Sequence, residues 1–101
     1  MDKKYAINIA KKFSKEVKGF FPIKKIVLFG SFAKGTNHKW SDIDIAVVVK
    51  NFDFDFFEAY QKLGKISIKL DTRIEPIIIE ESKDFSGFLK TIYKEGIVIY
   101  S

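Results

Sequence analysis

The chain contains no cysteine, one arginine, one histidine and one tryptophan. Without cysteine it has neither a disulfide framework nor a zinc site with thiolate ligands, and such a composition suits a reducing compartment. No apolar run approaches the length of about 18 residues that a membrane-spanning helix needs. The first residues also differ from a signal peptide, because their charges are scattered instead of being followed by an apolar run. We therefore expect a cytoplasmic protein that has no contact with a membrane.

Hydrophobic residues, by contrast, are plentiful. They make up 47% of the 101 residues and include eleven phenylalanines, which is ample for one core in a chain of one-domain length. No repeat, linker or low-complexity stretch interrupts the chain. We expect a single domain over residues 1–101 of the α/β (α+β) class, in which helices pack on a small mixed β-sheet.

The net charge is +5, and seventeen of the eighteen basic residues are lysines. This balance favours anionic partners such as nucleotides, nucleic acid or an acidic protein. The lysines are spread along the chain without a block of like charge, however, as they are on solvated helix faces. The charge alone therefore gives weak support to any one partner.

The most informative stretch consists of two apolar runs joined by a polar connection. The first run, Ile26–Phe29, ends in a Gly-Ser pair, and Asp42 and Asp44 open the second run, Ile45–Val49. Both runs have the length and the β-branched or aromatic content of strands. Side chains alternate between the faces of a strand, so the two aspartates share one face with Cα atoms about 6.6 Å apart. Two carboxylates so placed can share a hard divalent cation.

Gly30 and Ser31 lie where the first strand ends. Ser31 can cap a short helix, Phe32–Lys34, whose backbone N–H groups and dipole would attract a phosphate group. Lys34 could help to hold a triphosphate. In the connection that follows, we expect His38 to be a solvated surface group, and we expect Trp40 to cover the sheet edge rather than to stack on a nucleobase.

The rest of the chain predicts alternating helices and strands. The expected elements are a helix over Asp2–Lys18, a helix over Phe56–Leu63 that Asp55 caps and Gly64 ends, a strand over Ile66–Pro76 with an edge segment over Ile77–Glu80, a helix over Lys83–Lys94, and a strand or tail over Ile97–Tyr100.

The predicted strand Ile66–Pro76 carries polar residues on one face. If it pairs beside the strand of the two aspartates, Asp71 can supply a third carboxylate, with Glu75 on the same face, some 13 Å further along, as its competitor. Asp71 is favoured because it lies nearer the start of the strand. Arg73 could hold a phosphate bidentately, or it could pair with one of these two acids, and both possibilities stay open.

The segment Gly30–Gly35, followed by Ser41–Ile45, resembles the signature of minimal nucleotidyltransferases of the DNA polymerase beta superfamily. That signature is a Gly-Ser pair after a strand, a spacer, and Asp-x-Asp on the next strand. The resemblance implies the nucleotidyltransferase fold and transfer of a nucleoside monophosphate, with ATP as the foremost donor among nucleoside triphosphates. The residues it implies are Asp42, Asp44 and Asp71 as ligands of two Mg²⁺ ions, and Gly30 and Ser31 as the phosphate site. Lys34 and Arg73 are the cationic side chains that could join that site.

Minimal nucleotidyltransferases of this kind are encoded beside a small helical HEPN-type protein in toxin–antitoxin pairs. The resemblance therefore implies an antitoxin that forms a hetero-oligomer with a toxin and adenylylates a hydroxyl of it. Nucleotidyl transfer to RNA or to a small molecule, and a binding antitoxin without catalysis, are the alternatives. Nucleic acid is a less favoured partner than protein.

Overall fold

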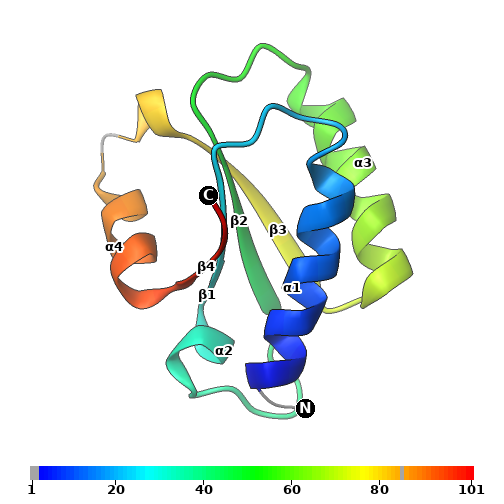
Figure 1. Ribbon diagram of the computed structural model, residues 1–101, viewed down its shortest axis with the longest axis vertical. Helices are drawn as coiled ribbons and strands as arrows, with labels where there is room; N and C mark the ends of the chain where they lie inside the picture. The colour runs from blue at the N-terminus through cyan, green and yellow to red at the C-terminus, as the bar shows by residue number, and fades with distance from the viewer. Residues whose placement is uncertain (1–2, 85) are drawn as a thin grey trace.

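The computed structural model describes residues 3–84 and 86–101 and contains a four-stranded sheet (Figure 1). The strands are β1 (Lys25–Phe29), β2 (Ile43–Val49), β3 (Ile74–Glu80) and β4 (Ile97–Tyr100), and their order is β3-β2-β1-β4. Strand β1 is antiparallel to both of its neighbours, β2 and β4, whereas β2 and β3 run parallel. The small mixed sheet expected from the sequence is thus confirmed.

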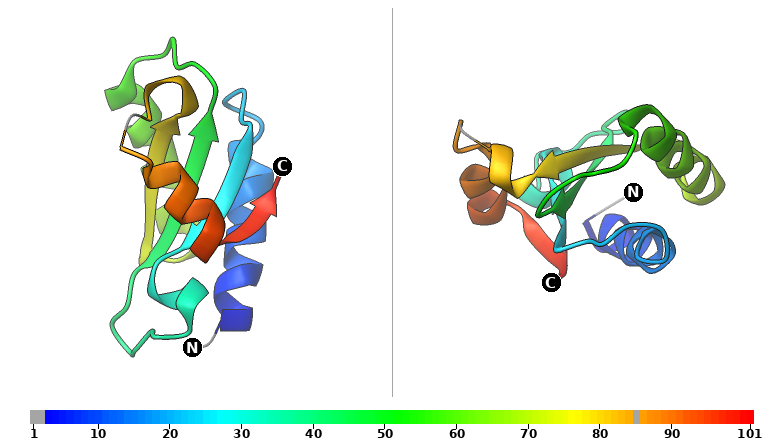
Figure 2. Two further views of the ribbon diagram at one scale, coloured as in Figure 1. Left: turned by 90° about the vertical axis from the view of Figure 1, so that its left-hand side faces the viewer. Right: turned by 90° about the horizontal axis from the view of Figure 1, so that it is seen from above.

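Helices cover both faces of this sheet. α1 (Lys3–Val17) and α3 (Phe56–Leu70) lie side by side on one face, and the shorter α4 (Phe88–Glu95) lies on the other (Figure 2). The single turn α2 (Ser31–Lys34) follows β1 directly. No helix in the described part of the chain is long and apolar enough to cross a membrane.

Strand β2 is buried on both faces, which explains its continuous apolar run. Ile43, Ile45 and Val47 belong to the core beneath α1 and α3, whereas Ala46 and Val48 pack with the residues of α4. Because side chains alternate along a strand, Asp44 lies on the α4 face of the sheet. The shortness of α4 leaves the beginning of β2 on that face free for a polar site.

The prediction of a strand over Ile66–Pro76 is wrong. α3 continues through Gly64 to Leu70, and β3 begins only at Ile74. Leu63 and Ile66 are buried at helical spacing, while Ile68, which the alternating pattern placed inside, is 71% exposed. A helix of 15 residues that packs on both α1 and β3 has outweighed the helix-breaking tendency of one glycine.

The other predicted boundaries are met more closely. α1 confirms the amphipathic N-terminal helix, although Asp2 lies outside the described residues, and Asp55 caps α3 by accepting hydrogen bonds from two backbone N–H groups at 2.8 and 3.3 Å. The predicted helix Lys83–Lys94 begins only at Phe88, because Gly87 adopts a left-handed conformation (φ 78°) as its N-cap. Gly87 thus starts this helix rather than interrupting it.

Candidate functional site

Gly30 joins the end of β1 to α2 in a conformation that only glycine adopts readily. Its φ of 75° and ψ of −154° fall in a region where a side chain would be strained. A Cβ atom at this position would also lie 2.1 Å from Oδ2 of Asp44. Two features therefore require glycine here: the positive φ of the backbone and the close approach of the Asp44 carboxylate.

Ser31 has a different role from the expected one. Gly30 is the N-cap of α2, without a side-chain capping bond, and Ser31 is the first helical residue. The turn is closed by the backbone bonds from Lys34 N–H to the Gly30 carbonyl (3.2 Å) and from Thr36 N–H to the Ser31 carbonyl (3.0 Å). The prediction that Ser31 caps the helix is therefore wrong, while its place beside Gly30 at the end of β1 is confirmed.

Three acidic residues meet where β2 and β3 begin. Asp42 directly precedes β2, Asp44 lies within it, and in the parallel register Asp44 stands opposite Glu75 of β3. Burial raises the pKa of Asp44, and the negative charges of Asp42 and Glu75 raise it further. The fold thus holds like charges close together, which costs free energy and is common at functional sites.

The acids fit a divalent cation that arrives with a phosphate ligand. Within the described residues, no three His, Cys, Asp or Glu side chains are arranged to hold a metal ion unaided. Mg²⁺ rarely uses an all-protein cage and is usually bound by one or two carboxylates together with substrate phosphates. The electrostatic crowding around Asp44 and the room that Gly30 leaves for its carboxylate match that mode of binding.

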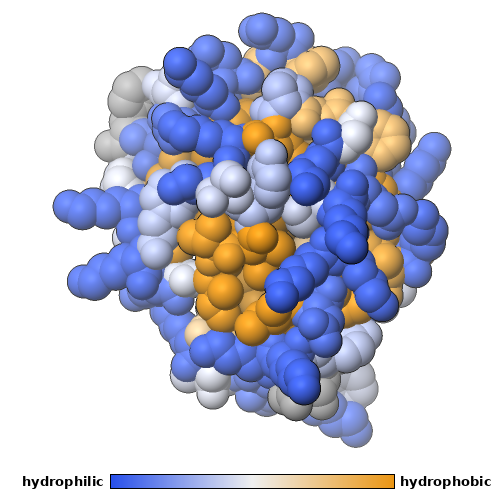
Figure 3. Space-filling model, viewed as in Figure 1, coloured by the Kyte–Doolittle hydropathy of each residue, from blue (hydrophilic) through white to orange (hydrophobic). Residues whose placement is uncertain are grey.

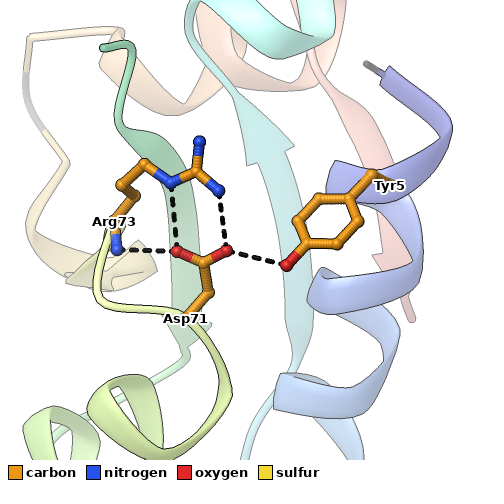
Figure 4. A network of polar contacts seen from close by, with 3 residues as sticks. All are labelled: Tyr5, Asp71 and Arg73. Carbon is orange, nitrogen blue, oxygen red and sulfur yellow. Dashed lines mark hydrogen bonds and ion pairs between the residues drawn. The ribbon is translucent and has the colours of Figure 1, made fainter. Parts of the chain in front are cut away.

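Asp71 does not lie on a strand but caps the C-terminal end of α3. Its carboxylate accepts hydrogen bonds from the backbone N–H of Arg73 (2.9 Å), from Nε (3.2 Å) and Nη2 (3.0 Å) of the same arginine, and from the hydroxyl of Tyr5 (2.9 Å) (Figure 4). Burial opposes its ionisation, but the bonds from Arg73 and Tyr5 outweigh burial and hold the pKa of Asp71 below its usual range.

These contacts remove the basis for Asp71 as the third acid. That prediction requires Asp71 to lie on a strand with Glu75, whereas Asp71 lies at the end of α3 and only Glu75 lies on β3. Both of its oxygens are already engaged, whereas Glu75 is exposed and stands opposite Asp44. For Arg73, the structure contains the ion pair with Asp71 that was one of its two expected roles.

A pocket of about 260 Å³ adjoins Gly30 between α2 and α4. Its lining combines aromatic and charged side chains, namely Phe29, Gly30, Lys34, Phe88, Thr91, Ile92 and Glu95. Across it, Nζ of Lys34 pairs with Oε2 of Glu95 at 3.3 Å. Glu95 could not be singled out from the sequence, because the path of α4 over the sheet brings the two residues together from positions far apart in the chain.

The loop between α2 and β2 borders the same end of the sheet. Trp40 is 76% exposed, so the prediction that it covers the sheet edge is wrong. His38 is exposed, as expected, and the loop is held by a bond from its backbone N–H to Oγ of Ser41 (2.9 Å). An exposed tryptophan in a loop beside the site is available to a ligand or a partner.

Comparison with known proteins identifies the family and the fold. The family model described as "Nucleotidyltransferase domain" matches residues 10–99. A Methanocaldococcus jannaschii protein named "Putative protein adenylyltransferase MJ0141" is 31% identical over 99 residues, which covers 92% of this chain and 97% of that protein.

Two crystal structures of toxin–antitoxin complexes share the fold. One, described as the toxin–antitoxin with AMP-PNP, is 26% identical, with a TM-score of 0.63 over 90% of this chain and 73% of that chain. The other, a mutant of the toxin–antitoxin MntA–HpeT, is 22% identical, with a TM-score of 0.65 over 91% of this chain and 73% of that chain, and it supports the fold alone. The family match extends over most of the described elements, including Gly30 and the acids of β2 and β3. This chain belongs to the nucleotidyltransferase domain family.

Proposed function

We propose that residues 1–101 form one nucleotidyltransferase domain that transfers AMP from ATP to a hydroxyl group of a partner toxin protein, and that this modification makes it an antitoxin. The observation that carries the proposal is the crowding of Asp42, Asp44 and Glu75 beside Gly30. Such crowding destabilises the metal-free protein and would be relieved by a divalent cation and its nucleotide.

The metal-binding acids in this proposal are Asp42 and Asp44, with Glu75 in place of Asp71. Two Mg²⁺ ions would be bound by these carboxylates and by the nucleotide, and they would stabilise the negative charge that develops on the entering and leaving oxygens. Ser31 and the backbone N–H groups at the start of α2 would hold the β- and γ-phosphates, and Lys34 would turn toward them from Glu95.

The reaction requires one bond to form and one to break. The acceptor hydroxyl oxygen attacks the α-phosphorus of ATP, the bond from this phosphorus to the oxygen that bridges the α- and β-phosphates breaks, and pyrophosphate leaves. The proton of the hydroxyl passes to a carboxylate, and Glu75, the exposed acid on β3, is the group we assign to accept it. No covalent intermediate with the protein is needed.

Two observations support the proposed partner: the names of similar proteins and the exposed hydrophobic side chains of this chain. The names of similar proteins include protein adenylyltransferase and toxin–antitoxin, and one of those complexes holds AMP-PNP. On this chain, Trp40 is exposed beside the acids, and hydrophobic side chains gather around the edge strand β4 (Figure 3), in which Val98 is 47% exposed. Exposed apolar surface of this kind is suited to a hetero-oligomer, for which a small helical HEPN-type toxin is the proposed partner.

Incubation with the product of the neighbouring gene, Mg²⁺ and each of the four labelled nucleoside triphosphates tests the proposal. Intact-mass analysis should show the partner heavier by one AMP unit when ATP is present, and unchanged with Asp44→Asn or with a chelator. A parallel reaction should offer generic RNA as the acceptor.

The outcomes separate the three alternatives. Label on RNA with none on the partner would replace the protein-modifying proposal by transfer to nucleic acid. Neutralisation of the partner by the Asp44→Asn variant, with no mass change in any reaction, would show that the chain acts by binding alone. A mass gain from another nucleotide would change the donor and leave the acceptor as proposed.

A further inference from the structure

The most elaborate polar network in the described structure lies next to the acids rather than among them. The Asp71 carboxylate receives four hydrogen bonds, two on each oxygen, and its side chain is only 8% exposed. Its donors come from the segment after α3 and from α1, as Figure 4 shows. Charge-assisted bonds at a buried carboxylate are strong, so this network makes a rigid junction between α1, α3 and the start of β3.

The junction continues through the backbone into the site. The Asp71 N–H donates to the Ser67 carbonyl (2.8 Å), and the Asp71 carbonyl accepts from Ile74 N–H (3.1 Å). The carbonyl of Arg73 accepts from the N–H of Ile43 at 2.8 Å. Ile43 lies between the two aspartates of the site, so the conformation of the turn after α3 is transmitted directly to the beginning of β2.

The register of the parallel strands depends on the same turn. Ile43 stands opposite Ile74, and one residue further Asp44 stands opposite Glu75. The negative charges on these two strands repel each other and would drive the strand ends apart if nothing held them. A rigid turn immediately before β3 opposes that separation.

We propose that Asp71, with Arg73 and Tyr5, is a positioning network that holds Asp42, Asp44 and Glu75 in place for the divalent cation, and that Asp71 is not itself a ligand. The inference rests on the proposed function, since it assumes a cation at these acids. It assigns to Asp71 a role that the sequence pattern could not suggest, because the pattern placed this residue on a strand. Supporting groups behind a metal site commonly affect metal affinity by about 10- to 100-fold.

The two possible roles of Asp71 make opposite predictions for Arg73→Gln. If Asp71 were a ligand, removal of the guanidinium would free its carboxylate, and metal affinity would stay the same or rise. If Asp71 is a positioning residue, removal of its main donor loosens the turn, and affinity falls as it does in Asp71→Asn. Tyr5→Phe removes only one of the four donors and should cause a smaller loss.

The experiment is a titration with Mn²⁺ alone, followed by its paramagnetic resonance signal, at a temperature where urea unfolding shows each variant to be folded. Asp71→Asn and Arg73→Gln should each weaken Mn²⁺ binding by about 10-fold or more, and Tyr5→Phe should weaken it by less. The variant that combines Asp71→Asn with Arg73→Gln should bind Mn²⁺ no more weakly than the weaker of the two single variants. Asp55→Ala is the control, because it removes the side-chain cap at the other end of α3. It should lower stability and leave Mn²⁺ affinity unchanged.

Several results would overturn the inference. Unchanged or tighter binding in Arg73→Gln, with a loss in Asp71→Asn, would make Asp71 a ligand. A loss in Asp71→Asn no larger than in Asp55→Ala would reduce its role to capping the helix. If Asp71→Asn does not fold, Tyr5→Phe with wild-type affinity would contradict the network. Wild-type protein that binds no Mn²⁺, or an Asp44→Asn variant that binds as well as wild type, would instead contradict the proposed function.

Discussion

The two ends of the sheet are built in opposite ways. At one end, which we call the carboxylate end, a glycine with positive φ, Gly30, lies beside the three like charges of Asp42, Asp44 and Glu75. At the other, the aromatic end, rings from the segments before β1 and after β2 contact one another. These rings are Phe21, Phe52, Phe54 and Phe56, with centroids 4.4 to 6.3 Å apart.

The two ends contribute to the stability of the fold with opposite signs. Ring contacts and apolar burial stabilise the aromatic end without any ligand. The carboxylate end is unfavourable in the metal-free protein, because Asp44 is partly buried beside other acids. A substitution at the carboxylate end should therefore change chemistry more than stability, and one at the aromatic end should do the reverse.

Asp44→Asn should show the largest contrast between an effect on activity and an effect on stability. Losing one charged ligand removes several kcal/mol of transition-state stabilisation, so nucleotidyl transfer should fall by about 100- to 1000-fold. The metal-free variant should nevertheless be more stable than wild type at neutral pH, because the removed carboxylate repelled its neighbours. Transfer assays and urea unfolding in the presence of a chelator measure the two effects.

The pH dependence of that stability gain has a definite sign. The pKa of Asp44 is raised in the folded protein, so wild type is free of the repulsion below the unfolded-state value of about 3.9 and acquires it as pH rises through the folded-state value. The gap between the variant and wild type should open over that interval and be absent at lower pH. An equal gap at every pH would mean that charge repulsion is not its cause.

Gly30→Ala should affect both properties. The added Cβ is strained at positive φ, which costs about 1–3 kcal/mol of stability, and it would meet the Asp44 carboxylate at 2.1 Å. We expect transfer to drop by at least about 10-fold, as one charge displaced from its place costs more than 1 kcal/mol. Gly35→Ala supplies the control, since that glycine also has a positive φ but has no atom near its Cβ position. Equal losses of activity in both variants would contradict the importance of the approach to Asp44.

Phe52→Ala should show the converse behaviour at the aromatic end. The ring contacts Phe21, Phe54 and Phe56 and packs on the core beneath α1 and α3. Losing this half-buried ring should cost about 2 kcal/mol, which corresponds to roughly 10 °C in melting temperature for a domain of this size. Transfer by the folded fraction should stay at the wild-type rate. A large loss of activity at constant folded fraction would show that the ends are coupled.

The sequence predicted where Gly30, Asp42 and Asp44 lie relative to the two strands, because the local pattern alone determines it. A Gly-Ser pair after one strand and two alternating aspartates before the next require no knowledge of the tertiary fold. The pattern could not show that Gly30 is contacted by Asp44, because that contact depends on how β1 and β2 pair. The sequence pattern also could not predict the ion pair between Glu95 and Lys34.

The third acid shows how a prediction of one residue's role depends on the element in which that residue is placed. Ile66, Ile68 and Leu70 alternate as in a strand, but Leu63, Ile66 and Leu70 also repeat as in a helix, and short apolar segments do not distinguish the two. Packing of this segment on α1 and β3 stabilises the helix over the strand. The strand then started at Ile74, and Glu75, not Asp71, came to stand beside Asp44.

The smallest expected effect compares two exposed ion pairs, one at each end of the sheet. Lys34 pairs with Glu95 beside the carboxylate end, and Lys24 pairs with Glu81 near the aromatic end. Exposed pairs contribute at most about 1 kcal/mol, so either glutamate can be changed without unfolding the protein.

Glu95→Gln should release Lys34 for the triphosphate and tighten nucleotide binding by up to about 5-fold, the factor that corresponds to 1 kcal/mol. Glu81→Gln makes the same change in net charge and should leave affinity unaltered. Trp40, exposed and alone of its kind in the chain, provides the fluorescence signal for both titrations with ATP and Mg²⁺. Because the effect acts through Lys34, it should disappear when Glu95→Gln is combined with Lys34→Ala. Tighter binding in both glutamate variants would indicate a general effect of net charge, and weaker binding in Glu95→Gln would mean that the glutamate contacts the nucleotide itself.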